Sequence, residues 1–201
     1  MPPREHPNRR TVRWKHFDYR GNATFFVTIV TWRRFCWFGD VVDGRMVLNE
    51  LGEVVRQEWL RTPAVRPNTA LGEFVIMPNH IHAVVELRMG HGWDQPHLFD
   101  KLGRPLVARD LGALVRGFKG AVTKRVNEIR QVDEPGSTWQ RKYYEHIVRD
   151  LADRQRIERY IRANPSRWEF DLENQLGKPD EFERSFWRTI HDQPDSAPRD
   201  S

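Results

Sequence analysis

Alternating or β-branched hydrophobic positions mark four stretches of the chain as predicted strands. "TFFVTIVTW" at 24–32 is rich in β-branched and aromatic residues, and "LGEFVIM" at 71–77 and "HIHAVVEL" at 80–87 follow further along. The turn-forming residues Pro78 and Asn79 join the second and third stretches into a predicted hairpin. "WQRKYYEHIVR" at 139–149 alternates imperfectly and predicts a further strand.

Hydrophobic residues spaced three and four apart predict the helices. The first spans 49–62 and stops at Pro63, the second spans 109–130, and a third follows the N-cap Asp150 and ends before Pro165. The second helix carries its apolar positions on one side and basic residues on the other. A short helix is also expected within 182–190.

The order β-α-β-β-α-β, followed by a last helix, predicts an α+β protein with a ferredoxin-like (RRM-like) antiparallel sheet. Two helices are expected on one face of that sheet, which leaves the other face for function. We divide the chain into a basic N-terminal arm at 1–23, a domain at 24–168 and an acidic C-terminal tail at 169–201, partly disordered.

Composition limits the class of protein. The 201 residues include 30% charged residues, yet 8 Trp, 11 Phe and 4 Tyr are enough for one core. The single cysteine, Cys36, excludes an internal disulfide and a cysteine-rich zinc site, and it favours a reducing, cytoplasmic compartment. We see no signal peptide and no run of about 18 apolar residues, so neither secretion nor a membrane span is expected.

Charge is distributed unevenly along the chain. Residues 101–168 hold 16 Lys and Arg against 8 Asp and Glu, whereas residues 169–201 hold 4 against 9. A basic region with interleaved aromatics suits a polyanion, because cations bind phosphates and flat rings stack on unpaired bases. A solvated, charge-rich helical surface is the alternative interpretation.

Two pairs of residues carry candidate chemistry. His80 and His82 leave one face of a strand together, where they could hold a divalent ion or a phosphate, although such a pair is often only solvated or hydrogen-bonded. Tyr160 and Asn164 lie four residues apart on one side of the last helix. A tyrosine hydroxyl needs a neighbouring metal or base to act as a nucleophile. The two histidines and the Asn164 oxygen could hold Mg²⁺ or Mn²⁺, while a structural tyrosine and an ordinary helix stop are the alternatives.

Three blocks in this order, "MPNHIHAVVEL", "WQRKYYEHIVRD" and "IERYIRANPSRW", resemble the REP-associated tyrosine transposases, single-tyrosine relatives with a histidine-hydrophobic-histidine motif. The resemblance covers roughly 24–168. It implies a ferredoxin-like nuclease domain that cleaves single-stranded DNA near a palindromic hairpin and leaves a 5′-phosphotyrosine link. It also implies a bacterial, nucleoid-associated enzyme that needs Mg²⁺ or Mn²⁺ and no nucleotide cofactor.

Carried over by the resemblance, His80 and His82 fit the metal motif and Tyr160 fits the nucleophile. Asn164 fits the third ligand position, where some relatives have glutamine. Tyr143 and Tyr144 compete for the nucleophile role, but we expect them to stack or pack, and His146 is a further candidate for polarising the site. The predicted DNA-binding residues are Arg116, Lys119, Lys124, Arg125, Arg141, Lys142, Tyr143, Tyr144 and Arg149.

Other interpretations remain open at this point. The same fold could serve a domesticated protein that binds DNA hairpins without cleaving them. It could also serve an RNA-binding module that stacks bases on an open sheet, or a rolling-circle replication initiator. Both a monomer and a homodimer are open, since many insertion-sequence relatives are dimers whereas the resemblance to the REP-associated members allows a monomer.

Overall fold

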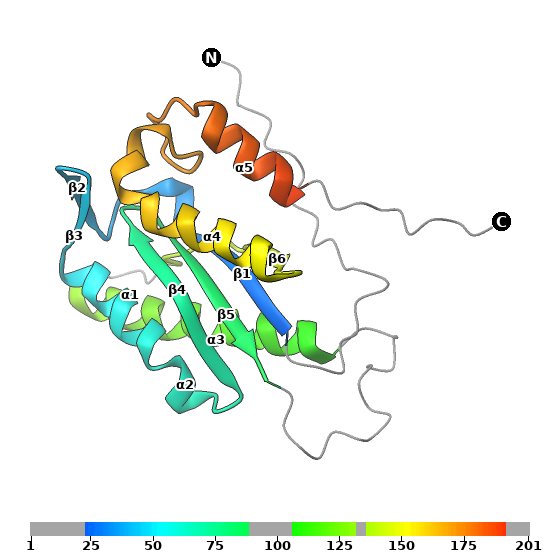
Figure 1. Ribbon diagram of the computed structural model, residues 1–201. Helices are drawn as coiled ribbons and strands as arrows, with labels where there is room; N and C mark the ends of the chain where they lie inside the picture. Colours follow the sequence, from blue (N-terminus) through cyan, green and yellow to red (C-terminus); the bar gives the residue numbers. More distant parts are fainter. Residues whose placement is uncertain (1–22, 89–105, 132–135, 192–201) are drawn as a thin grey trace.

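The computed structural model describes residues 23–88, 106–131 and 136–191 (Figure 1). Its elements are β1 (Ala23–Val30), η1 (Trp32–Arg34), β2 (Gly39–Val42), β3 (Arg45–Leu48), α1 (Glu50–Leu60), α2 (Thr62–Val65), β4 (Thr69–Met77), β5 (His80–Leu87), α3 (Leu106–Arg130), β6 (Tyr144–Ile147), α4 (Leu151–Ala163), η2 (Pro165–Phe170) and α5 (Glu181–His191). Residues 1–22 of the predicted basic arm and 192–201 of the predicted tail lie outside the described residues.

Four strands form one antiparallel sheet in the order β4-β5-β1-β6. The two central strands are β5 and β1, and their register places Thr28 opposite His82 and Val30 opposite His80. This is the ferredoxin-like arrangement that the order of predicted elements indicated. The predicted fold class is confirmed.

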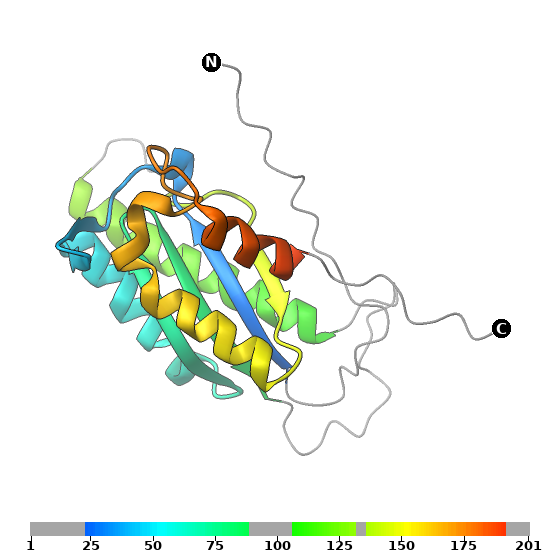
Figure 2. The ribbon, with the colours of Figure 1, turned by 45° about the horizontal axis from the view of Figure 1, so that its top comes forward.

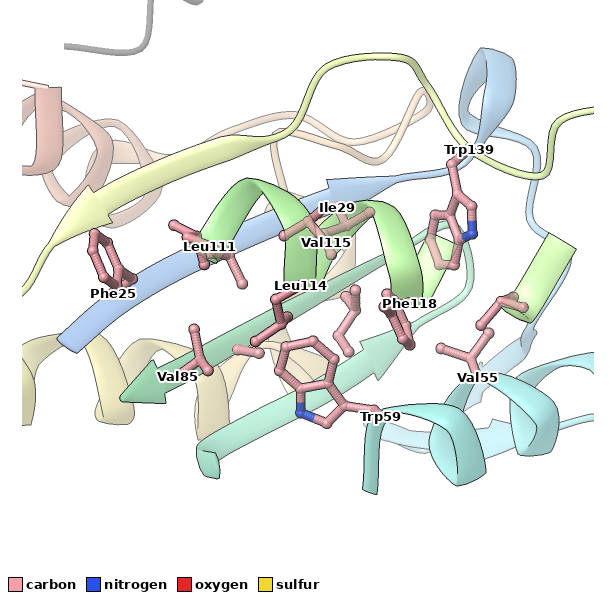
Figure 3. Packing of buried hydrophobic residues seen from close by; sticks show 14 of the residues in the cluster. Phe25, Ile29, Val55, Trp59, Val85, Leu111, Leu114, Val115, Phe118 and Trp139 are labelled. Carbon is pink, nitrogen blue, oxygen red and sulfur yellow. The ribbon is translucent and has the colours of Figure 1, made fainter. Parts of the chain in front are cut away.

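One face of the sheet packs on α1 and α3 and forms the larger hydrophobic core. Phe25 and Ile29 of β1 meet Leu114 and Phe118 of α3 there, and Trp59 of α1 contacts the Phe118 ring edge-on (Figure 3). Trp139, which comes before β6, closes one end of this core against Phe118. The apolar stripe of α3 therefore faces the sheet, as its spacing predicted.

The opposite face of the sheet is covered by α4 and α5 (Figures 1 and 2). A second hydrophobic cluster includes Phe26 and Val84 from the sheet, Ile157 and Ile161 from α4, and Trp187 from α5. We left this face for function, and it carries both the tyrosine-bearing helix α4 and the additional helix α5. It is covered because Phe26 and Val84 would otherwise expose apolar surface to water.

Local sequence signals explain several element boundaries. Asn49 caps α1 by accepting from Gly52 N, and Asp150 caps α4 by accepting from Asp153 N at 2.8 Å. The β2–β3 hairpin was not predicted, although its turn holds Asp43 and Gly44, at φ 49° and 70°, the left-handed geometry of a two-residue hairpin turn. The strand expected over 139–149 is shorter and spans only β6.

Candidate metal and tyrosine site

The two histidines of β5 point to the α4–α5 side of the sheet and are fully buried. Their ring centroids lie 4.3 Å apart. His82 Nδ1 is 2.9 Å from Thr28 Oγ1 on the neighbouring strand, and His80 Nδ1 is 2.8 Å from Asn79 Oδ1. The alternation of β5 thus places both rings together, as the sequence predicted.

The Asn79 side chain fixes the tautomer of His80. Its Nδ2 donates to two backbone carbonyls, of Glu173 at 2.9 Å and of Arg34 at 3.2 Å. Those contacts make Oδ1 the acceptor, so His80 Nδ1 donates the proton, and in the neutral ring Nε2 carries the lone pair. In metal-binding histidines, a hydrogen bond donated by the ring nitrogen that does not bind the metal orients the imidazole in this way.

Asp171, from the segment after η2, completes a group of metal-ligand type. Its Oδ2 lies 3.7 Å from His80 Nε2 and 4.0 Å from His82 Nε2, and the three residues are buried. The three ligand atoms lie within 4.8 Å of one another, whereas neighbouring ligands about 2.1 Å from a common Mg²⁺ lie about 3 Å apart, so the group would contract around a bound ion. Two imidazoles and a carboxylate are a donor set that suits a divalent metal.

Burial raises the pKa of Asp171 to about 7, although hydrogen bonds from Asn164 Nδ2 and Glu173 N act in the opposite direction. A divalent cation between this carboxylate and the two imidazoles would offset the cost of burying its charge. The donor set and the burial of Asp171 both fit such an ion.

Asn164, the predicted third ligand, lies at the C-cap of α4 beside Asp171. It is buried, and its Nδ2 donates to Asp171 Oδ2 at 2.7 Å. Its Oδ1 has no hydrogen-bond partner among the described residues. The predicted ligand role of Asn164 therefore stays a prediction, and the structure adds Asp171 next to it.

Tyr160 lies in the same buried cluster, with its ring 5.3 Å from the His82 ring and stacked 3.7 Å from the Phe186 ring. Its hydroxyl donates to Glu183 Oε1 at 2.9 Å, and Trp187 Nε1 donates to that hydroxyl at 3.2 Å. Burial, with the charges of Asp171 and Glu183, raises the pKa of Tyr160 well above 10. The structure thus brings Tyr160, Asn164 and the two histidines together.

Glu183, on the first turn of α5, binds the Tyr160 hydroxyl through its carboxylate. One oxygen, Oε1, accepts from Tyr160 Oη, from Leu172 N at 3.1 Å and from Trp187 Nε1 at 2.8 Å. Burial and the charge of Asp171 raise the pKa of Glu183 to about 7. Asp171, Glu183 and Trp187 all belong to the segment predicted to be an acidic tail, and no motif in the sequence marked them.

The predicted DNA-binding residues of α3 lie across the sheet from this site. Lys119 Nζ donates to the backbone carbonyls of Gln140 at 2.9 Å and Lys142 at 3.2 Å, and burial lowers the pKa of Lys119 to about 8. Arg125 binds Glu58 and Gln57 of α1, each at 2.8 Å. Arg116 and Lys124 are exposed, and Lys124 Nζ lies 3.9 Å from Glu128 Oε1 one turn along α3. Three of the four cations, Lys119, Lys124 and Arg125, therefore also have partners within the protein.

The basic block at 141–149, which precedes α4, also contains both exposed side chains and side chains with partners within the protein. Arg141 and Lys142 are exposed, whereas Tyr143 packs against the larger core and Tyr144 lies in the second cluster, its hydroxyl donating to Ile190 O. Arg149 Nε lies 3.5 Å from Asp153 Oδ2.

His146 pairs with Asp153 and is not part of the metal group of His80, His82 and Asp171. The His146 Nε2 atom is 2.9 Å from Asp153 Oδ2. The pair ties β6 to the first turn of α4.

Fold and site together define a ferredoxin-like domain with a buried tyrosine beside a His-His-Asp group. No protein-family model matches the chain. An uncharacterised protein of Haemophilus influenzae is 37% identical over 168 residues, which cover 82% of this chain and 92% of that protein. The chain belongs to the same protein family as this Haemophilus protein.

The solved structures that are similar to the chain include two with 17% sequence identity to it. A REP-associated tyrosine transposase bound to a REP hairpin has a TM-score of 0.49 and covers 89% of this chain and 87% of its own. A candidate transposase from Deinococcus radiodurans has a TM-score of 0.41 and covers 75% of this chain and 96% of its own. Within the described part of the chain, no helix has the length and apolar content needed to cross a membrane.

Proposed function

We propose that the protein is a metal-dependent tyrosine transposase that cleaves and rejoins single-stranded DNA carrying palindromic hairpins. The proposal is supported mainly by one observation, the convergence of Tyr160, His80, His82 and Asp171 in a single buried cluster. These residues come from β5, α4 and the segment after η2. The three sequence blocks that resemble the REP-associated tyrosine transposases supply the reaction class.

The chemistry is a phosphodiester transesterification. The Tyr160 oxygen attacks the scissile phosphorus and forms a 5′-phosphotyrosine link, while the bond from phosphorus to the 3′ oxygen breaks. The hydroxyl proton that Tyr160 loses is balanced by the proton that the leaving 3′ oxygen gains, which gives a free 3′-hydroxyl. Bound Mg²⁺ or Mn²⁺, held by the two histidines and Asp171, would offset negative charge developing on the phosphate oxygens. Because the link conserves the phosphodiester bond, rejoining needs no nucleotide cofactor.

The Tyr160 hydroxyl is buried in this structure and is not accessible to a DNA phosphate. The Tyr160 side chain is 2% exposed and lies under α5, with the hydroxyl hydrogen-bonded to Glu183 and Trp187. A phosphate reaches Tyr160 Oη only after the start of α5 moves away. That movement would also separate the Glu183 carboxylate from the hydroxyl and so remove one cause of its raised pKa.

The same observation favours a second candidate, a domesticated protein that binds DNA hairpins and does not cleave them. In that case the Tyr160, Glu183 and Trp187 contacts would only stabilise the packing of α5 on α4. The RNA-binding interpretation needs an open sheet for base stacking, but α4 and α5 cover that face.

Covalent attachment to DNA separates the two candidates. The wild-type protein is incubated with Mn²⁺ and a hairpin-bearing single strand, and the protein–DNA adduct is separated by denaturing electrophoresis and mapped by peptide mass spectrometry. We expect the nucleotide on Tyr160 and no adduct from Tyr160→Phe, which keeps the ring stacked on Phe186. Tyr143→Phe and Tyr144→Phe are the matched controls and should form the adduct. DNA binding without any adduct would support the hairpin-binding protein instead.

A further inference from the structure

Residues 32–37, with the sequence WRRFCW, form a short turn that we call the aromatic loop. It presents two large rings to solvent, since Trp32 is 47% and Phe35 is 45% exposed. Exposed aromatic side chains that are close in sequence and lie on one turn are unusual for a surface that binds nothing.

The backbone of the loop is held in an uncommon conformation. Arg33 and Arg34 have φ angles of 52° and 57°, in the left-handed region that non-glycine residues seldom adopt. The turn is closed by Phe35 N donating to Trp32 O at 3.2 Å and by Thr31 Oγ1 donating to Phe35 O at 2.8 Å. Such outliers concentrate where a loop binds a ligand.

Cations accompany the rings. The Arg33 guanidinium lies 5.9 Å from the Trp32 ring centroid, and Phe35 stacks on Trp37 with centroids 5.8 Å apart. Arg130, from the end of α3, covers Trp37 at 4.7 Å. Residues 31–39 contain two arginines and no acidic residue. Flat rings beside guanidinium groups match the bases and phosphates of a nucleic acid strand.

Hydrogen bonds connect the aromatic loop to both sides of the metal group. Asn79 contacts His80 through Oδ1 and the Arg34 carbonyl through Nδ2. On the other side, Arg34 Nε binds Glu173 Oε2 at 2.8 Å, and Glu173 N donates to Asp171 Oδ1 at 2.7 Å. Figures 1 and 2 show the blue turn of η1 beside the orange segment that follows α4, at one end of the sheet.

We propose that the aromatic loop is a stacking platform for unpaired bases of the single-stranded DNA next to the scissile phosphate. The inference rests on the proposed function and adds the surface that holds the strand. Its occupant is single-stranded DNA, because the loop combines exposed rings with positive charge and is connected through Asn79 and Glu173 to His80 and Asp171 of the metal group.

The experiment measures binding of the full chain to two fluorescent DNA probes by anisotropy. One probe is a hairpin with single-stranded extensions on both sides, and the other is the same hairpin with blunt ends. The Trp32→Ala, Phe35→Ala double variant should lose tenfold or more in affinity for the extended probe and less than twofold for the blunt one. Trp32→Tyr with Phe35→Tyr, which keeps two rings, should restore most of the affinity.

A matched control is Val42→Ala with Val47→Ala, two residues of the neighbouring hairpin that are 52% and 54% exposed. It should bind both probes as the wild type does. Light scattering of each protein tests the other occupant, a second copy of the chain. A wild-type dimer that becomes monomeric in the Trp32, Phe35 alanine variant would overturn the stacking platform.

The outcomes also separate this inference from the proposed function. If the alanine variant binds the extended probe as tightly as the wild type and still forms the Tyr160 adduct, the platform is refuted and the transposase proposal stands. If the wild type binds neither probe, the proposed function fails and the platform fails with it.

Discussion

Replacement of Asp171 by asparagine should have opposite effects on the metal-free and metal-bound protein. The substitution keeps the shape of the side chain and removes a charge that is 1% exposed. Burial raises the pKa of Asp171 from 3.8 to about 7, so the folded state disfavours the ionised carboxylate.

The sign and size of the effect follow from proton linkage. Below about pH 4 the carboxyl is protonated in both states and contributes nothing to the pH dependence. As the pH rises to 7, the unfolded chain releases the proton while the folded chain keeps it, so the free energy of unfolding falls. Each pKa unit corresponds to about 1.4 kcal/mol, which gives a cost of about 4 kcal/mol above pH 7.

The asparagine variant removes this cost but replaces one of two acceptor oxygens by a donor. In the wild type Asp171 Oδ2 accepts from Asn164 Nδ2 and Oδ1 accepts from Glu173 N, each at 2.7 Å, so the new amide nitrogen must face one of these donors. Allowing about 1–2 kcal/mol for that mismatch, we expect Asp171→Asn to stabilise the metal-free protein by about 2–3 kcal/mol at pH 8. At pH 4 the gain should be absent.

Metal should reverse the advantage. At a free Mn²⁺ concentration 100 times the dissociation constant, the wild type gains about 2.7 kcal/mol of unfolding free energy. Asp171→Asn should gain little, because it lacks the carboxylate ligand. The assay is urea unfolding followed by tryptophan fluorescence, with chelator or with Mn²⁺.

Asp40→Asn serves as the control, since Asp40 is exposed, and it should change the unfolding free energy by no more than about 0.5 kcal/mol. An Asp171→Asn variant that is less stable than the wild type at pH 8 in chelator would refute the burial argument. Equal stabilisation of both proteins by Mn²⁺ would remove Asp171 from the metal group.

Three further predictions concern the histidines, the basic block and the base of α4. His80→Ala with His82→Ala should abolish Mn²⁺ binding in calorimetry, and wild-type affinity should weaken as the pH falls below about 6.5, the ordinary pKa of imidazole, because only neutral imidazole binds metal; unchanged affinity would exclude both ligands. Arg141→Ala with Lys142→Ala should lower the slope of log affinity for DNA against log salt by about 1–2, since each lost phosphate contact releases one counterion fewer, whereas an unaltered slope would place the DNA elsewhere. Asp153→Asn should destabilise the fold by about 2–4 kcal/mol at pH 7, because the hydrogen bonds and charges of His146 and Arg149 hold the pKa of Asp153 below its usual range despite the opposing effect of burial. In urea unfolding, this difference from the wild type should shrink as the pH falls below about 4. A pH-independent difference would contradict the ion-pair explanation.

The local sequence was sufficient to predict most elements of the fold, and in the site it was sufficient to predict the two pairs of residues that lie on β5 and on α4. The pleat of a strand puts His80 and His82 on one face, and the pitch of a helix puts Tyr160 and Asn164 on one side. Asp150 and Pro165 set the two ends of α4 within a residue. These are short-range rules, so the sequence alone could determine them.

Long-range packing decided the remainder. Asp171 and Glu183 carry no local signal. Glu183 joins the site because α5 packs on Phe26 and Val84 of the sheet, and Asp171 joins it beside Asn164, which donates to its carboxylate. Lys119 looks like a free phosphate-binding cation in the sequence, yet carbonyl groups about 20 residues away surround it. Whether a polar side chain is solvated, paired or buried depends on which distant elements meet it, and burying apolar surface against those elements is what fixes their positions.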